Sequence, residues 1–450
     1  MPDGTGFTVS EASIAFSDDA LALAFSARQE DNLLYVSAWS AWLRWDGCRW
    51  RRDDTLHVFD LVRALCRDEA ARAEAEEKDG EAIARNLTSA GTVAAVERLA
   101  RSDARHARRA EDFDADPWAL NTPGGVVDLK TGRMRPHRKN DLFTKVTTVT
   151  PARGRCRRWV RFLLEITHVD RAMVRYLQRF IGYTLTGVIE EHAFAFLCGP
   201  GGNGKSVLLS TVAGGLGDYA TTAMADVFTA GKNDQHPTHL ASLRGARLVA
   251  VTETEEGRPW AESRIKSLTG GDRISARVMR GDPFEFSPVF KLWIAGNHRP
   301  VLRNPDPAMR RRLHLMPLTF VPAKPDPKLI ETLRAELPEI LQWAIEGCLA
   351  WRAKRLQPPA VVTEATDSYF EEQDSLAAWV ADRCERRPLA ETPSRAMFAD
   401  WKRWTTERGE EAGTEKRFSE GMQRHAAKKR VNAGMVFVGY KLLPAASGTW

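Results

Sequence analysis

Three short apolar runs in the middle of the chain alternate with polar and glycine-rich segments. The runs cover residues 193–198, 247–251 and 290–296, and each has the length of a strand that is buried on both faces. The segment after the first run, 207–213, predicts a helix that opens at Lys205. Buried strands and a helix in this order predict an α/β core.

The region ahead of these strands has a different pattern. Residues 56–110 are rich in Ala, Arg and Glu and poor in Gly and Pro, which predicts helices with charged outer faces. A hairpin is expected over 125–132. The apolar clusters at 173–177 and 181–185 predict two short helices that pack ahead of the α/β core.

A cluster of tryptophans lies near the start of the chain. Trp39, Trp42, Trp45 and Trp50 surround the dipeptide Asp46-Gly47, which is typical of a turn after a strand. These rings are either core and hairpin aromatics or a platform on which nucleic-acid bases stack. The pattern favours the first interpretation and leaves the second open.

A Pro-rich break at 357–359 closes the α/β region. Beyond it, residues 394–401 and 417–425 predict helices, and residues 436–442 predict a strand. The order of these elements, with the basic cluster 428–430 among them, resembles a winged-helix domain, which would bind DNA or contact another protein. We therefore divide the chain into a Trp-rich lead (1–55), a helical region with a hairpin (56–160), the α/β domain (161–355) and a small winged-helix-like domain (365–450).

Composition restricts the classes of protein that fit. Of the 450 residues, 43% are hydrophobic and 28% are charged, as in ordinary globular proteins. No apolar run has the length of a membrane helix, and residues 1–4 lack the pattern of a signal peptide. The six cysteines have no zinc or CxxC spacing, which indicates reduced thiols in a cytoplasmic protein with no membrane partner. The net charge of +6 permits a polyanionic partner.

The segment between the first apolar run and its helix carries the clearest chemical signature. Residues 199–206 fit the P-loop pattern, in which a glycine and four further residues precede Gly-Lys-Ser. Glycines allow a tight turn that aims backbone N–H groups at phosphate oxygens. Lys205 is expected at the β- and γ-phosphates, and the Ser206 hydroxyl at Mg²⁺. The sequence therefore predicts an ATP hydrolase whose binding loop consists of Gly199, Pro200, Gly201, Gly202, Asn203, Gly204, Lys205, Ser206 and Val207.

Polar residues that follow the other runs complete this predicted site. Glu253 and Glu255 come directly after the second run, where one carboxylate, Glu253, would help hold Mg²⁺ and the other would polarise the attacking water. Asn297 follows the third run and would orient water at the γ-phosphate. Arg311 and Arg312 suit an arginine finger, which in trans would place ATP between subunits. An acidic surface turn, a strand-end turn and a solvated basic edge remain the plain alternatives.

The order of these residues along the chain resembles superfamily 3 helicases. A closer resemblance is to phage and plasmid primase-helicases, to which poxvirus uncoating-factor-type NTPases are related. It implies an AAA+-like P-loop core and ATP-driven unwinding by a hexameric ring, with single-stranded or forked DNA as the partner, in a bacterial or phage-infected cell. The resemblance is carried by residues 42–47, 121–129, 199–206, 253–257, 268–273, 290–293, 297–298 and 311–313.

The resemblance also implies a hairpin that touches DNA in the pore. Residues 274–286 have its place, with two alternating runs around a Gly-Asp-Pro turn. Lys266, Arg277 and Arg280 are the implied phosphate contacts, and a plain structural hairpin is the alternative. Many relatives carry a primase domain ahead of the helicase. No primase-type acidic cluster or zinc ribbon occurs here, so we expect no primer synthesis by this chain and regard a separate primase or polymerase as a candidate partner.

Two classes of function therefore remain in competition. The first is a ring helicase that unwinds DNA during replication of a phage, plasmid or integrated element. The second is an ATP-gated loading factor, or an origin-binding protein, that binds DNA without unwinding it. The two glutamates and the arginine pair favour turnover, and the hairpin favours translocation.

Overall fold

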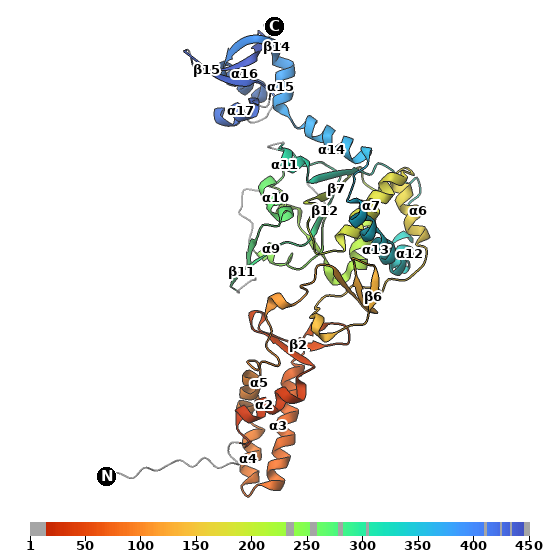
Figure 1. Ribbon diagram of the computed structural model, residues 1–450, viewed down its shortest axis with the longest axis vertical. Coiled ribbons are helices and arrows are strands. Elements are labelled where there is room, and N and C mark those ends of the chain that lie inside the picture. Colours follow the sequence, from red (N-terminus) through yellow and green to blue (C-terminus); the bar gives the residue numbers. More distant parts are fainter. Residues whose placement is uncertain are drawn as a thin grey trace, which may run out of the picture.

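The computed structural model describes residues 15–230, 238–252, 259–277, 282–302, 306–408, 412–423, 425–432 and 434–444. Figure 1 shows three parts in succession along the long axis of the molecule: the helices α2 to α5, a central sheet with its helices, and a small C-terminal part. The predicted boundary at residue 55 lies inside the core of the first part, because Phe25 and Trp42 pack there with Val62 and Val96.

Within its described residues, the N-terminal part combines a three-stranded antiparallel sheet with the helices α2 to α5. Residues 56–110 are helical for most of their length, as the Ala/Arg/Glu pattern predicts. The sheet has the order β1-β2-β3, and its second strand ends at Trp45, just before the Asp46-Gly47 turn. The elements are α2 (Asp18–Gln29), β1 (Leu33–Val36), β2 (Ala41–Trp45), β3 (Trp50–Arg52), α3 (His57–Glu76), α4 (Gly80–Leu87) and α5 (Ala90–Ala100).

A second small sheet and two helices lead into the central part. The predicted hairpin is present as β5 (Gly125–Asp128) and β6 (Arg133–Arg135), and β4 (Ala119–Thr122) pairs with β5. The helix α6 (Arg157–Ile166) precedes α7 (Arg171–Thr184).

The prediction of two short helices was wrong, because α7 is continuous. The Asp170 side chain accepts hydrogen bonds from the N–H groups of Ala172 and Met173 and so caps the start of the helix. No Pro interrupts it, and its single glycine, Gly182, lies where α7 crosses α13 (Leu337–Lys354). A Cβ at Gly182 would lie 2.1 Å from the Cys348 backbone nitrogen, so only glycine allows this approach.

The central part is built on a five-stranded parallel sheet. Its strand order is β13-β7-β12-β9-β8, which places β7 between β13 and β12. All three predicted buried strands are present as β7, β9 and β12. The strands are β7 (Phe194–Cys198), β8 (Ala220–Ala223), β9 (Leu248–Thr252), β12 (Lys291–Gly296) and β13 (Leu313–Pro317).

Helices and loops cover both faces of this sheet. Alternate residues of β7 belong to two separate apolar cores, because successive side chains of a strand point to opposite faces. Ala195 and Leu197 pack with residues of α7, α8 and α13, whereas Phe194 and Phe196 pack with Trp260. The remaining elements of this part are α8 (Lys205–Leu216), α9 (Thr238–Ala241), α10 (Glu262–Gly270), β10 (Ile274–Arg277), β11 (Pro283–Phe286), α11 (Pro307–Arg310), α12 (Leu329–Ala335) and α14 (Ala360–Glu372).

Two buried cations join the start of the sheet to the segments before it. The Arg247 guanidinium donates to the carbonyl oxygens of Leu185 (2.7 Å) and Ala119 (2.7 Å). The Lys291 ammonium donates to the Thr186 carbonyl (2.5 Å) and lies 4.5 Å from the Tyr183 ring. Burial lowers the pKa of both side chains. These contacts anchor the amino ends of β9 and β12.

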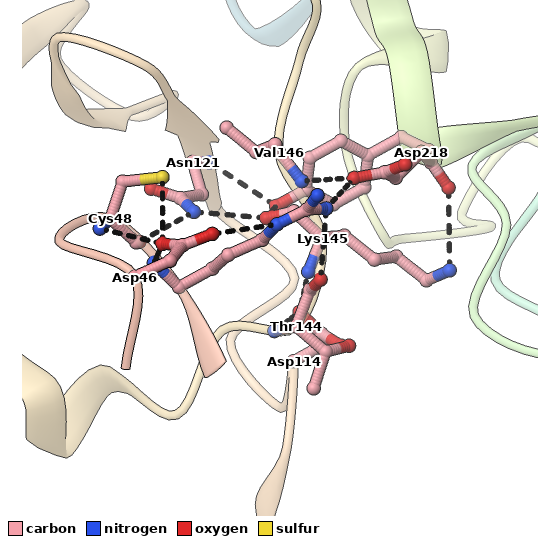
Figure 2. Close-up of polar contacts among 10 residues, drawn as sticks. Asp46, Cys48, Asp114, Asn121, Thr144, Lys145, Val146 and Asp218 are labelled. Atoms are coloured by element: carbon pink, nitrogen blue, oxygen red, sulfur yellow. Dashed lines mark hydrogen bonds and ion pairs between the residues drawn. The ribbon is translucent and has the colours of Figure 1, made fainter. Parts of the chain in front are cut away.

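A polar network ties the N-terminal part to the end of α8 (Figure 2). Asn121 on β4 donates to the Cys48 carbonyl in the β2–β3 turn (3.0 Å). Asp218, two residues beyond α8, pairs with Arg49 from that turn and accepts a hydrogen bond from the Val146 N–H (3.1 Å). The N-terminal hairpin is therefore linked to the helix that begins at Lys205.

The C-terminal part has the order helix, strand, helix, helix, strand, strand. The sheet order is β14-β16-β15, with β15 and β16 as a hairpin, and Trp379, Trp401 and Phe437 lie in the core. The expected helices and final strand are present. The elements are α15 (Ser375–Arg383), β14 (Cys384–Pro393), α16 (Ser394–Glu407), α17 (Glu415–Met422), β15 (Ala427–Val431) and β16 (Gly434–Leu442).

Two further predictions concern the whole chain. All six cysteines are free thiols, as their spacing predicted. Among the described helices, none is both long enough and apolar enough to cross a membrane.

Candidate functional site

The loop between β7 and α8 depends on its glycines. Gly199, Gly202 and Gly204 have φ angles of 146°, 76° and 87°, which other residues rarely adopt. A Cβ at Gly199 would lie 1.9 Å from the Leu318 carbonyl oxygen, so this position has no room for a side chain. The chain can therefore turn sharply from the sheet into α8.

The backbone of this loop offers unused hydrogen-bond donors. The structure shows no hydrogen bond from the N–H groups of residues 201–207 to any other described residue. The first intrahelical bond runs from the Leu208 N–H to the Gly204 carbonyl (2.9 Å). Unpaired N–H groups at a helix N-terminus, together with the helix dipole, attract anions and phosphates in particular.

The Lys205 ammonium lies inside the loop. It donates to the carbonyl oxygens of Gly199 (2.7 Å) and Pro200 (2.9 Å) and to the side-chain oxygens of Asn203 (2.9 Å) and Asn297 (3.0 Å). The residue is 6% exposed, and burial lowers its pKa. All four acceptors are uncharged, so the positive charge has no carboxylate partner among them.

Asn297 is brought to the loop by the register of the sheet. It follows β12, whose last residue, Gly296, pairs with Cys198 at the end of β7. On the other side of β12, Ala295 pairs with Thr252, the last residue of β9. The carboxyl ends of these strands therefore meet at one edge. The predicted Glu253 and Glu255 come next in the sequence and lie outside the described residues.

A cleft of about 920 Å³ opens at this edge. Its lining includes residues 201–207, Thr252 and Asn297, and the exposed Ser206 is among them. No sequence motif predicted the other walls of the cleft, which come from α6 and from the segment after β13. These walls consist of Arg158, Arg161, Phe162, Glu165, Ile166, Phe320, Pro322, Ala323, Lys324, Pro325, Asp326, Pro327, Leu329 and Ile330.

The walls combine apolar surface with charge. Phe162, Ile166 and Phe320 supply apolar contact, and Arg158 forms ion pairs with Glu165 (3.2 Å) and Asp326 (3.5 Å). The volume lies in the range of pockets that hold a molecule of cofactor size. No local motif marks these residues, because they meet the loop only through the fold.

Arg311 and Arg312 lie at the opposite edge of the sheet. The Arg312 carbonyl accepts a hydrogen bond from the Phe194 N–H (2.8 Å), and Leu313 pairs with Phe194, the first residue of β7. Because β7 runs from this edge to the loop, its length separates the arginines from Lys205 of the same chain. Burial lowers the pKa of Arg312, and the neighbouring charge of Arg311 adds to this effect.

The side chains of the two arginines differ. The Arg311 side chain is exposed and makes no hydrogen bond or ion pair with a described residue, whereas the Arg312 guanidinium donates to the Ala308 carbonyl (2.9 Å). The buried Nε of Arg312 has no partner in the described part of the chain.

The predicted DNA contacts lie on and near one hairpin. Strands β10 and β11 pair antiparallel, as expected, and Ala276 packs in the core beneath them. Arg277 ends β10, while Arg280 lies outside the described residues. Lys266 on α10 forms an ion pair with Asp306, so its ammonium has a partner within the chain.

Only one of the two predicted Mg²⁺ ligands lies within the described residues. Across the described ranges, no group of three or more His, Cys, Asp or Glu side chains is placed to hold a metal ion. The Ser206 hydroxyl is exposed in the cleft, and its predicted carboxylate partner, Glu253, falls in the undescribed segment after β9.

Comparisons with known proteins extend over the same regions. Residues 22–168 match a family model described as D5 N terminal like, and residues 197–312 match a family of unknown function, DUF5906. The second match begins at the end of β7 and ends at Arg312. It therefore contains the glycine loop, Asn297 and the arginine pair.

Among curated proteins, the chain is similar to viral proteins. It is 24% identical over 296 residues to the putative helicase L207/L206 of Acanthamoeba polyphaga mimivirus, covering 60% of this chain and 31% of that protein. It is 25% identical over 326 residues to the putative helicase 022R of Frog virus 3 (isolate Goorha), covering 67% and 32%. The chain thus spans about a third of the length of these relatives.

Among solved structures, the apo structure of the NrS-1 C terminal region is similar over almost its whole length. It has a TM-score of 0.53 at 8% identity and covers 93% of this chain and 98% of that chain. A second, A form apo structure has a TM-score of 0.52 at 9% identity and covers 94% and 100%. These TM-scores show a shared fold.

The chain is therefore a mixed α/β protein with a cleft at the carboxyl edge of a parallel five-stranded sheet. These matches support the resemblance to phage-type primase-helicases that the sequence motifs predicted.

Proposed function

We propose that the chain is an ATP hydrolase that drives a DNA helicase and acts as a ring of identical subunits. The observation that carries the proposal is the division of the sheet between its two edges. Lys205, Asn297 and the end of β9 face the cleft at the carboxyl edge, while Arg311 and Arg312 lie at the amino edge. An ATP bound in the cleft would therefore need an arginine from a neighbouring subunit.

The loop fits a nucleoside triphosphate. Its unpaired N–H groups and glycine turns suit phosphate oxygens, and Lys205 could exchange its four neutral acceptors for a charged phosphate, which is a stronger partner. Ser206 and Glu253 would hold Mg²⁺, which supplies charge neutralisation at the phosphates. Glu255 and Asn297 would orient the attacking water. Phe162, Ile166 and Phe320 form the apolar surface that a base requires.

The strand order supports an AAA+-like P-loop core of superfamily 3. In the order β13-β7-β12-β9-β8, the strand before Asn297 lies between the P-loop strand and the strand before Glu253. Arg311, which has no described partner, and Arg312 are then the finger that stabilises charge on the γ-phosphate across a subunit boundary. A head-to-tail contact of this kind closes into a ring, for which we propose six subunits.

Two elements support DNA as the partner. The hairpin of β10 and β11 carries Arg277 and leads to Arg280, and Lys266 lies on the preceding helix; we propose these as contacts to single-stranded DNA in the pore. The element order of the C-terminal part matches a winged helix, whose hairpin carries Lys429 and Arg430 in exposed positions. The similar viral proteins are named as putative helicases.

A second candidate function is an ATP-gated loading or origin-binding factor. The winged-helix-like order of the C-terminal part favours it, because such domains bind duplex DNA without unwinding it. The chain itself is proposed to make no primers, and a separate primase or polymerase is the proposed partner.

Strand displacement on forked DNA with a 3′ or a 5′ tail decides between the candidates. We expect ATP-dependent displacement with one tail polarity, and its loss in Lys205→Ala. DNA-stimulated hydrolysis without displacement on either fork would favour the loading factor. A purified oligomer without any ATP hydrolysis would contradict the helicase and favour an origin-binding factor.

A further inference from the structure

The N-terminal hairpin carries a small pocket outside the cleft. The pocket has a volume of about 250 Å³, and it combines apolar rings with cationic side chains. Its two tryptophans belong to the cluster near the start of the chain for which a stacking role stayed open. It is lined mainly by Trp39, Leu43, Trp50, Arg49, Arg51 and Arg52.

The tryptophans of this region differ in whether the indole N–H donates a hydrogen bond to another described residue. The Trp42 indole N–H donates to Glu97 (2.5 Å), and that of Trp50 donates to the Lys139 carbonyl (2.9 Å), and both rings are buried. Trp39 is half-buried, packs against Phe113 at 5.2 Å, and donates no hydrogen bond from its indole to a described residue. Trp39 therefore keeps apolar surface and a free donor at the pocket.

The arginines form a local excess of positive charge. Arg44 on β2 and Arg51 on β3 are directly opposite in the strand register, an arrangement that is destabilising for like charges. Arg52 is exposed, and its guanidinium contacts only the Trp39 carbonyl (3.4 Å) among the described residues. Arg51 lies 4.0 Å from the carboxylate of Asp54. Among the described residues, no acid forms an ion pair with Arg44 or Arg52. A polyanionic ligand would compensate the remaining charge.

The carboxylates of Asp46 and Asp53 accept hydrogen bonds from backbone N–H groups. Asp53 accepts hydrogen bonds from the N–H groups of Thr55, His57 and Val58 at the start of α3. Burial alone would raise its pKa, but these hydrogen bonds lower it overall. Asp46 accepts in the same way from Cys48 and Arg49. Neither carboxylate is therefore available to neutralise Arg51 and Arg52.

We propose that this arginine–tryptophan pocket is a second contact for single-stranded DNA, with a base against Trp39 and phosphates at Arg51 and Arg52. Aromatic stacking beside basic side chains binds single strands without sequence preference. The inference rests on the proposed function, since the DNA strand bound at this pocket would be the strand along which the ring translocates. The pocket also borders the network of Figure 2, because its Arg49 pairs with Asp218 beyond α8.

Fluorescence anisotropy of a labelled oligo-dT with the full-length protein, in the absence of nucleotide, tests this proposal. Changing Arg51 and Arg52 together to Glu should weaken binding and reduce the slope of log affinity against log salt by about 1.4, which is about 0.7 for each phosphate that an arginine no longer neutralises. Trp39→Ala should weaken binding about tenfold, and Trp39→Phe should largely restore it, because a phenyl ring still stacks.

A matched control reverses the same charge elsewhere in the N-terminal part. Arg67→Glu with Arg85→Glu changes exposed helical positions and should leave affinity and salt slope unchanged. The thermal unfolding midpoint of every variant should match the parent. An unchanged salt slope in the Arg51/Arg52 variant, in a parent that binds the oligonucleotide, overturns the pocket and leaves the proposed function standing. A parent that binds no oligonucleotide overturns both.

Discussion

Lys205 and Lys291 are both buried lysines of the central part, and oxygen atoms surround both ammonium groups. Lys205 contacts two loop carbonyls and two asparagine side chains. Lys291 contacts the carbonyl and hydroxyl of Thr186 and the Val289 carbonyl. Burial lowers the pKa of both. By composition of their surroundings alone, the two sites are alike.

Their positions on the sheet distinguish them. Lys205 borders the cleft at the carboxyl edge, beside N–H groups that have no described partner. Lys291 is 1% exposed at the start of β12, where it holds the segment after α7. The lysine at the carboxyl edge therefore borders an open cleft, whereas the lysine at the amino edge is buried in contacts that join parts of the fold.

The largest expected effect is at Lys205. Lys205→Ala should lower ATP hydrolysis by about 10²–10³-fold, because a positioned charge that stabilises the transition state is removed. The unfolding midpoint without nucleotide should change little. Steady-state phosphate release measures turnover, and Lys328→Ala, an exposed lysine at the start of α12, is the control. Full turnover in Lys205→Ala would mean that the loop is not the ATP site.

His314 on β13 should make stability depend on pH. Burial lowers its pKa to about 4, and its Nδ1 shares a hydrogen bond with the Tyr176 hydroxyl. The unfolded chain then binds more protons between pH 6.5 and 4, so stability is lost as pH falls through this window, by up to about 3 kcal/mol. Denaturant titrations from pH 7.5 to 4.5 should show a smaller pH dependence in His314→Asn. An equal dependence in both proteins would exclude His314 as the cause.

Lys291→Met should lower the stability of the fold and leave ATP turnover nearly unchanged, the opposite of the result expected for Lys205→Ala. Removing the ammonium leaves the Thr186 and Val289 carbonyls without this donor, which should destabilise the fold by about 1–3 kcal/mol. ATP turnover below the unfolding transition should stay within a few-fold of the parent. Denaturant unfolding and phosphate release on the same preparation test both statements. Lost turnover with unchanged stability would remove the distinction between the two edges.

The smallest effect is expected at Lys266. Its ion pair with Asp306 is partly exposed, so Lys266→Ala should change the free energy of unfolding by less than about 1 kcal/mol. If Lys266 contacts phosphate in the pore, this variant should also weaken binding of single-stranded DNA, whereas Asp306→Asn should strengthen it by releasing the ammonium. Equal DNA affinity in both variants would assign Lys266 a purely structural role.

Local patterns were sufficient to predict part of this picture. The strands β7, β9 and β12, the start of α8 at Lys205 and the hairpin of β10 and β11 all followed from apolar runs and glycine spacing. Lys205 and Asn297 lie in contact because parallel strands bring their carboxyl ends together, and their roles at ATP stay predictions. Each of these features depends on a few consecutive residues.

Features that depend on distant segments were missed. The wall formed by Phe320 and α6 meets the loop only in three dimensions, and the carbonyl partners of Arg247 and Lys291 leave no sequence signal. The continuity of α7 was missed because propensity did not reveal its packing against α13. Glu253, Glu255 and Arg280 lie outside the described residues and stay predictions.

The central claim is that the two edges of neighbouring subunits form one ATP site. Mixing the Lys205→Ala protein with an Arg311→Ala/Arg312→Ala protein, each inactive alone, and measuring ATP hydrolysis in the mixed oligomer tests this claim most directly. A boundary that joins the intact loop of one subunit to the intact arginines of the other should restore hydrolysis. Mixed oligomers that form and stay as inactive as either variant alone would contradict it.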